Sequence, residues 1–120
     1  MRLKNTMKSK RELMSTKYKI EIPLEKINSF CTKWNICEFA FFGSVLRDDF
    51  DPKTSDIDVM ITFIPGQHWG WEIVTMKEEL ELIFNRPIDL VTKRAIENSK
   101  NPFRKKEILE SYQVVYEKAA

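Results

Sequence analysis

Residues 55–63 read Ser-Asp-Ile-Asp-Val-Met-Ile-Thr-Phe, and the predicted fold depends on this stretch. The run from Ile57 to Phe63 is apolar and of strand length, which predicts a buried β-strand. Because alternate side chains along a strand point to the same face, Asp56 and Asp58 are expected to lie together at its start. The stretch therefore predicts a strand with a charged site at one end.

Shorter apolar runs predict the neighbouring strands. Residues 37–42, Cys-Glu-Phe-Ala-Phe-Phe, have strand length and aromatic content, and they stop abruptly at Gly43-Ser44. Residues 88–92, Ile-Asp-Leu-Val-Thr, form a third run, and residues 114–116 are expected to add a short edge strand.

Apolar residues at three-and-four spacing predict three amphipathic helices. The first begins at Pro23 and ends near Asn35, the second spans residues 71–84, and the third begins at Asn101-Pro102 with Asn101 as its cap. The side chains expected to face the core are Leu24, Ile27, Phe30, Cys31 and Trp34 in the first helix, Ile73, Met76, Leu80, Ile83 and Phe84 in the second, and Phe103, Ile108 and Leu109 in the third. The element order predicts an α/β (α+β) fold with a small mixed sheet of three to four strands packed by helices.

The chain is short and its charge is unevenly distributed. Its 120 residues allow one domain, and no apolar run approaches the roughly 20 residues needed to cross a bilayer. Residues 1–20 carry seven Lys or Arg against one acid, whereas residues 21–120 carry thirteen against seventeen. We expect residues 1–20 to be a basic, flexible tail and residues 21–120 to be one domain. The alternative role for the tail is contact with nucleic acid or an acidic partner.

Two features favour a cytoplasmic location. The tail lacks the apolar segment and the small-residue cleavage site of a secretory signal. Cys31 and Cys37 match no metal-ligand spacing and are expected to be buried free thiols. Free thiols are typical of a reducing compartment.

A third carboxylate, Asp89, lies within the strand at residues 88–92, and the intervening helix can return it beside Asp56 and Asp58. Three carboxylates on one sheet face repel one another, and divalent cations are the simplest compensation. Mg²⁺ binds carboxylate oxygens and substrate phosphates, and a pair of such ions stabilises phosphoryl displacement. In the alternative interpretation Asp56 caps a turn, Asp58 is a surface residue, and Asp89 pairs with Arg86 or Lys93.

The loop after the first strand has features of a phosphate site. Gly43 lets a phosphate approach the backbone, Ser44 adds a hydroxyl donor, and Arg47 offers a fork for phosphate oxygens. A Gly-Ser pair after a strand is by itself an ordinary turn. The combination with an Asp-x-Asp at the start of the next strand is much rarer.

Residues 42–47, 55–59 and 88–92, taken in this order, resemble the nucleotidyltransferases of the DNA polymerase β-like superfamily, and most of all its minimal nucleotidyltransferases. The resemblance covers residues from about 22 to 117. It implies that Asp56 and Asp58 hold two Mg²⁺ ions and that Asp89 completes the metal shell where an acceptor hydroxyl loses its proton.

The resemblance also implies that Gly43 and Ser44 bind the triphosphate of the incoming nucleotide, and Arg47 matches an Arg common in this branch. The sequence departs from the family where Asp48 replaces the Gly that usually follows this Arg. The spacer from Ser44 to Asp56 is also one residue longer than the common form. The loop is therefore longer and more acidic than in relatives.

The minimal branch further implies a partner. Its members resemble antitoxins that move AMP from ATP onto a tyrosine of a HEPN ribonuclease toxin. The alternatives are a binding module that neutralises its partner without catalysis, and transfer to a small molecule; a membrane role and nucleic-acid polymerisation are not expected. The loop aromatics His68, Trp69 and Trp71 are expected either to seal a core edge or to contact a partner or base.

Overall fold

The computed structural model describes residues 21–47, 50–51, 55–67 and 70–118. The predicted tail at residues 1–20 lies outside this part of the chain, as do Asp48, His68 and Trp69. The described elements are α2 (Leu24–Lys33), β1 (Ile36–Phe42), a 3₁₀ turn η1 (Gly43–Leu46), β2 (Ile57–Phe63), α3 (Glu72–Phe84), β3 (Ile88–Thr92), α4 (Lys93–Glu97), α5 (Pro102–Ser111) and β4 (Gln113–Glu117).

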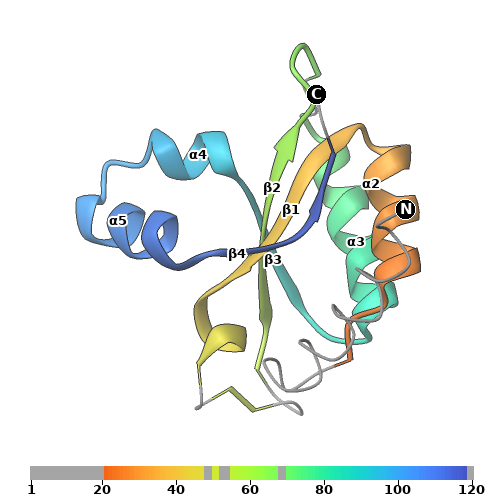
Figure 1. Cartoon of the computed structure of the whole chain (residues 1–120), viewed down its shortest axis with the longest axis horizontal. Coiled ribbons are helices and arrows are strands. Elements are labelled where there is room, and N and C mark those ends of the chain that lie inside the picture. The colour runs from red at the N-terminus through yellow and green to blue at the C-terminus, as the bar shows by residue number, and fades with distance from the viewer. Residues whose placement is uncertain (1–20, 48–49, 52–54, 68–69, 119–120) are drawn as a thin grey trace, which may run out of the picture.

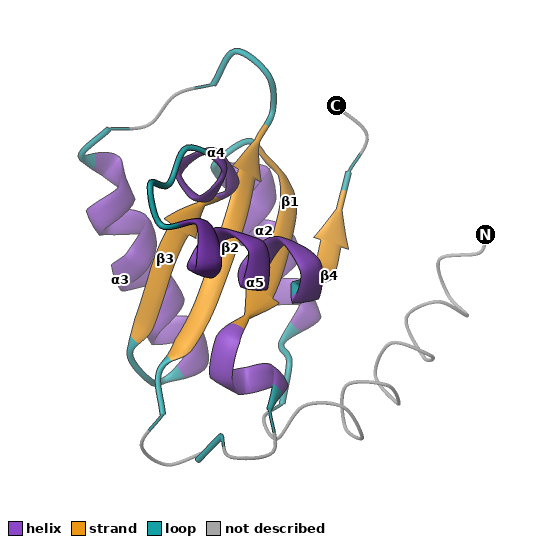
Figure 2. Cartoon of the chain, turned by 90° about the vertical axis from the view of Figure 1, so that its left-hand side faces the viewer, coloured by secondary structure: helices purple, strands orange, loops and turns teal. Residues whose placement is uncertain are grey.

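The described strands form one mixed sheet in the order β3-β2-β1-β4. Strand β1 runs antiparallel to β2 and β4, whereas β2 and β3 are parallel and are joined by α3. Figure 2 shows this sheet with α4 and α5 lying across it. The predicted mixed sheet of three to four strands is confirmed, with the segment at 114–116 as its edge strand.

Helices cover both faces of the sheet, α2 and α3 on one side and α4 and α5 on the other (Figure 1). Strand alternation sends Phe39, Phe41 and Val59 into the core under α2 and α3, and Phe42 and Met60 into a smaller cluster under α4 and α5. Phe39 and Phe41 meet edge to face with their centroids 5.9 Å apart. Burial of each side chain of this size stabilises the folded protein by about 2 to 3 kcal/mol.

A polar contact joins α2 to α3 outside the core. The Lys33 ammonium lies 2.6 Å from Glu79 Oε2, and the Trp34 indole donates to Glu79 Oε1 at 2.9 Å. The predicted end of the first helix is confirmed, because Asn35 takes a left-handed φ of 57° directly after it. Pro23 precedes the helix as its N-cap instead of being its first residue.

The structure corrects the predicted environment of several side chains. Phe103 does not face the core but is 86% exposed. Ile108 is the buried residue of α5, and Phe103, five positions earlier, lies about 140° around the helix from it. Trp71 is 78% exposed, so it does not seal a core edge, and Cys37 is half-buried although Cys31 is fully buried.

Helix α4 was not anticipated from the sequence. It is only five residues long, and Thr92 Oγ1 caps it by accepting from the Ala95 backbone amide. No helix in the described part of the chain is long and apolar enough to span a membrane.

Candidate active site

Asp58 and Asp89 face each other near the starts of β2 and β3, and Asp56 lies just before β2. The two strands are parallel with Asp58 opposite Asp89, so both side chains leave the sheet on the same face. The preceding pair, Ile57 and Ile88, is buried in the core under α2 and α3. Asp56 is exposed just before β2, close enough for its charge to raise the pKa of Asp58. The fold thus brings Asp58 and Asp89 together on one face of the sheet, with Asp56 just before the start of β2.

The turn after β1 closes around Asp58. Phe42 pairs with Asp58 across the antiparallel strands, and Gly43 follows with a φ of +75°. A Cβ on Gly43 would collide with Asp58 Oδ2, so only glycine allows this approach. The Ser44 backbone amide donates to the Asp58 carboxylate, and Ser44 Oγ donates to the Asp56 carbonyl at 3.5 Å.

Asp58 carries a strongly perturbed carboxyl group. Burial raises its pKa to about 6, helped by the negative charges of Asp89 and Asp56. The hydrogen bond from Ser44 and the positive charge of Arg104 lower it, but by less. The site is therefore short of positive charge, which is the electrostatic condition in which a cation binds most favourably.

Arg104 is a member of this site that sequence reasoning missed. It lies in the first turn of α5, one helical turn before Ile108, which packs with Met60 on the carboxylate side of the sheet. No spacing rule connects α5 with Asp58, because the two are 46 positions apart. The only signal in the sequence was the four-residue interval between Arg104 and the apolar Ile108, which places the two on the same side of a helix.

Packing and hydrogen bonds hold the described residues between η1 and β2. Phe50 is buried, and the Arg86 guanidinium lies 5.6 Å from its ring centroid. Asp51 and Ser55 exchange hydrogen bonds of 2.9 Å, backbone amide to Oγ and backbone amide to carbonyl. Arg47 is exposed at the end of η1, and its amide donates to the Ser44 carbonyl at 2.9 Å.

The cations expected as alternative partners of Asp89 are engaged elsewhere. Arg86 donates to the Ser55 carbonyl at 3.4 Å. Lys93 donates to the Tyr112 hydroxyl at 2.9 Å and to Glu38 at 3.5 Å, at the far end of the strands. Asp89 itself is exposed, on the same face of the sheet as Asp58.

The donor set suits a hard cation. Among the described residues, no three His, Cys, Asp or Glu side chains stand close enough together to hold a metal ion by themselves. Mg²⁺, however, is commonly bound by one or two carboxylates with its other positions filled by water and substrate phosphate. The clustered negative charge around Asp58 fits that kind of site.

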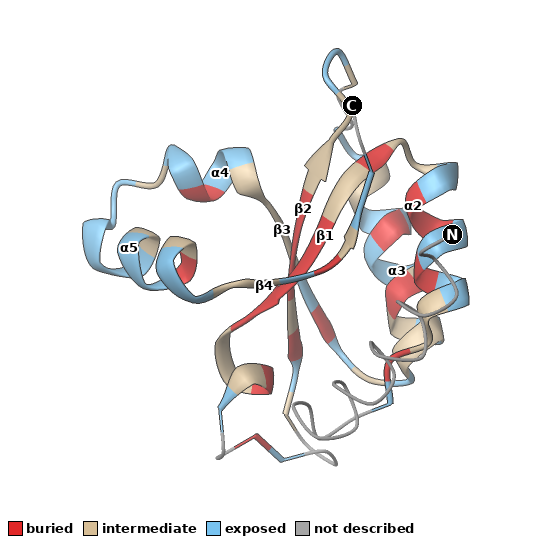
Figure 3. Cartoon of the chain, in the orientation of Figure 1, coloured by how far each residue is buried: buried red, intermediate tan, exposed pale blue. Residues whose placement is uncertain are grey.

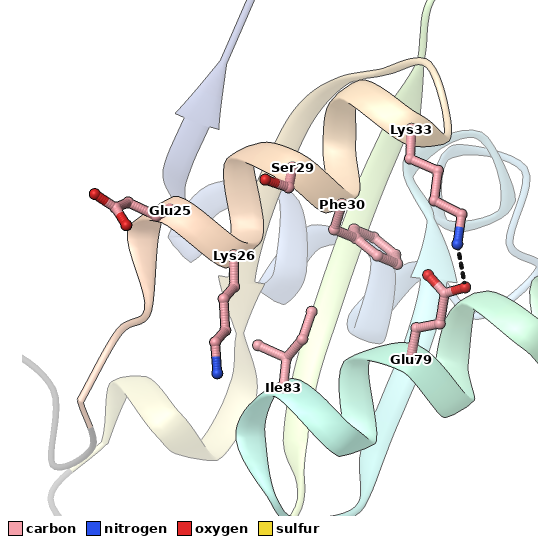
Figure 4. A pocket seen from close by; sticks show the side chains of 7 residues that line it. All are labelled: Glu25, Lys26, Ser29, Phe30, Lys33, Glu79 and Ile83. Atoms are coloured by element: carbon pink, nitrogen blue, oxygen red, sulfur yellow. Dashed lines mark hydrogen bonds and ion pairs between the residues drawn. The ribbon is translucent and has the colours of Figure 1, made fainter.

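A shallow hollow lies on the opposite side of the sheet, between α2 and α3 (Figure 4). Its volume is about 440 Å³, with Phe30 and Ile83 at its floor and the Lys33–Glu79 ion pair at one end. The three carboxylates do not contribute to its lining.

Comparison with known proteins assigns the fold to a family. The sequence model described as "Nucleotidyltransferase domain" matches residues 24–115. The chain belongs to the nucleotidyltransferase domain family. It is 35% identical over 79 residues, 65% of the chain, to MJ1379, a proposed protein adenylyltransferase of Methanocaldococcus jannaschii, and covers 75% of that protein. A second proposed protein adenylyltransferase of that organism, MJ0435, is 32% identical over 70% of the chain and 84% of its own length.

Solved structures share the fold of this nucleotidyltransferase. A mutant of the toxin–antitoxin complex MntA–HpeT superposes with a TM-score of 0.61 at 12% identity, over 81% of this chain and 75% of that one. A toxin–antitoxin structure with AMP-PNP superposes with a TM-score of 0.61 at 14% identity, again over 81% of this chain and 75% of that one. A structure described as a proposed minimal nucleotidyltransferase gives 0.52 at 23% identity, over 75% of this chain and 86% of that one.

Proposed function

We propose that this nucleotidyltransferase moves AMP from ATP onto a hydroxyl of a partner protein, and that the partner is a HEPN ribonuclease toxin silenced by the transfer. The observation that carries the proposal is the pairing of Asp58 with Asp89 on one sheet face, enclosed by the Gly43–Ser44 turn. The names of the two relatives from M. jannaschii support protein as the acceptor class. The fold shared with toxin–antitoxin structures, one of them with AMP-PNP, supports the toxin and the nucleotide.

In the proposed reaction the acceptor oxygen attacks the α-phosphorus of ATP. A new P–O bond forms, the bond between the α-phosphorus and the bridging oxygen breaks, and pyrophosphate leaves. Asp89, exposed beside Asp58, accepts the proton of the attacking hydroxyl. Most of the rate comes from positioning and charge stabilisation, as is general for phosphoryl transfer.

The chain's own residues divide the remaining roles. Asp56, Asp58 and Asp89 would hold two Mg²⁺ ions together with water and substrate phosphate, and these ions would supply positive charge against the charge that develops on the phosphate. The Gly43–Ser44 turn and Arg47 bind the triphosphate. The backbone at Gly43 leaves no room for a side chain, which suits close approach by a ligand.

Cys31 and Cys37 form no disulfide with each other. Free thiols support a cytoplasmic site of action, where such partner toxins would be met. The domain boundary near residue 21 and a separate role for the basic segment 1–20 remain part of this proposal.

A second candidate function is neutralisation of the partner by binding alone. The observation that favours it is the acidic character of the loop: Asp51 is exposed in the segment that lengthens the spacer. Added negative charge there disfavours a triphosphate. In this case a variant that lacks Asp56 and Asp58 would still neutralise the partner fully.

The test is transfer of labelled AMP. The protein is incubated with α-labelled ATP, Mg²⁺ and the purified product of the neighbouring gene. We expect a labelled partner, loss of label with Asp56→Ala or Asp58→Ala, and no loss with Glu97→Ala, an exposed acid on α4. Chelation of divalent ions should also stop transfer. Labelling that survives both aspartate substitutions would contradict the proposed mechanism.

A further inference from the structure

Phe103 is a large apolar side chain exposed on the carboxylate side of the sheet. It is 86% exposed in the first turn of α5, where residues 100–104 are all exposed, as the pale blue start of this helix in Figure 3 shows. A single exposed ring is ordinary on a protein surface. Its meaning therefore depends on the residues around it and on its distance from the site.

The surroundings of Phe103 are strongly basic. Residues 100–106 contain four Lys or Arg and no Asp or Glu, and Lys100, Arg104 and Lys106 are exposed. The amino-terminal end of α5 adds partial positive charge, while acidic residues follow only in its later turns. We call Lys100, Phe103, Arg104 and Lys106 the α5 entrance surface.

The α5 entrance surface borders the carboxylates. Ile108 packs with Phe42 and Met60, and Met60 lies two residues after Asp58 on the same face of β2. Arg104, one turn before Ile108, is near enough for its charge to act on Asp58. A protein bound on this surface would reach Asp58 and Asp89 without crossing the sheet.

Of the other large apolar side chains exposed in the described part of the chain, three are placed differently, and the fourth, Val114 on the edge strand β4, is 41% exposed. Trp71, Val74 and Leu82 belong to α3 or the residue before it, and α3 covers the opposite face of the sheet (Figure 1). A partner bound there would be separated from Asp58 by the sheet. Leu82 is 84% exposed and so provides a matched control for Phe103.

We propose that the α5 entrance surface is the docking site for the acceptor protein, and that the docking segment of the acceptor is acidic with an apolar pocket for Phe103. The inference rests on the proposed function, because it supplies the recognition of the hydroxyl-bearing partner. The basic residues attract the acidic segment and set its orientation, and Phe103 anchors it. The acceptor hydroxyl then lies on the side of the sheet where Asp58 and Asp89 meet.

The first experiment measures transfer of labelled AMP against the concentration of the neighbouring gene's protein product. Phe103→Ala should raise the KM for this protein about tenfold, as expected for an aromatic anchor, while Leu82→Ala leaves it unchanged. Calorimetry with AMP-PNP should give Phe103→Ala the wild-type affinity, which separates acceptor docking from nucleotide binding. Both residues are exposed, so both variants should keep the wild-type melting temperature.

The second experiment reverses charge at two exposed lysines. Lys106→Glu, in the α5 entrance surface, should raise the KM for the same acceptor at low salt, and Lys77→Glu on α3 should not. Because salt screens exposed charges, the difference should shrink between about 50 and 300 mM NaCl.

The outcomes separate the two proposals. Absence of transfer by the unsubstituted protein overturns the proposed function and the docking site with it. Transfer with an unchanged KM for Phe103→Ala, or with equal changes in the control variants, overturns the docking site alone. Label that is released by ribonuclease and not by protease would identify RNA as the acceptor, which also overturns it.

Discussion

Asp58→Asn should make the metal-free protein more stable at pH 8 while removing transfer activity. Burial raises the pKa of Asp58 from 3.8 to about 6, with Asp89 and Asp56 contributing. Because the folded-state pKa lies above the unfolded value, the folded protein holds this proton more tightly. The resulting stabilisation is fully present below about pH 4 and is lost as the pH rises through 6, where a charged Asp58 opposes folding.

The size of the effect follows from the shift. A rise of about two pKa units corresponds to an upper bound of about 3 kcal/mol, and solvent screening of the half-buried carboxylate reduces this to roughly 1 to 2 kcal/mol. Asparagine has the same shape, can still accept the Ser44 amide and carries no charge. The substitution should therefore raise the free energy of unfolding by this amount at pH 8 and change it little at pH 4.

The assay is urea unfolding of the wild type and Asp58→Asn in EDTA at pH 8 and pH 4, with Glu78→Gln as an exposed control that leaves the unfolding free energy unchanged. A gain for Asp58→Asn that is equal at both pH values, or absent at pH 8, would refute the electrostatic reasoning. With added Mg²⁺ and AMP-PNP the wild type should become more stable than Asp58→Asn, because only the wild type keeps the full set of carboxylates that bind the ligand.

Further substitutions test the packing around the site and the core. Gly43→Ala should cut transfer by at least tenfold and lower the free energy of unfolding by about 1 to 3 kcal/mol, because the added Cβ meets Asp58. Gly66 has a similar φ but open space around it, so Gly66→Ala should destabilise the protein less and leave transfer activity intact. Phe39→Ala should lower the urea unfolding free energy by about 3 to 5 kcal/mol. Burial raises the pKa of both cysteine thiols, but Cys31 is fully buried and Cys37 only half-buried, so a thiol reagent should modify Cys37 first and Cys31 only as the protein unfolds.

The strands were predictable because their signals are local. The ranges 57–63 and 88–92 agree with β2 and β3 to the residue, since apolar β-formers are bounded there by breakers such as Pro65 and Pro87. The helix at α3 was placed within one residue for the same reason. Helix α4 has no amphipathic repeat, because five residues form little more than one turn, so periodicity could not reveal it.

The phase of α5 was not predictable. An Asn-Pro cap shows where a helix begins but not which side faces the sheet, and Phe103 was wrongly expected in the core. Ile108 is the buried residue of this helix, and its packing on Phe42 and Met60 sets the rotation. That rotation also carries Arg104 towards Asp58.

The sequence by itself determined the strands, the family resemblance and the identity of the candidate carboxylates, because these depend on residue type and short spacing. Only the tertiary structure decided that Asp58 and Asp89 are register neighbours, since strand pairing joins residues 31 positions apart. It also decided that Gly43 touches Asp58, that Arg104 adds a cation to the site, and that Phe103 is exposed on the carboxylate side. Contacts of this kind arise from how the layers pack, which no local pattern in the chain encodes.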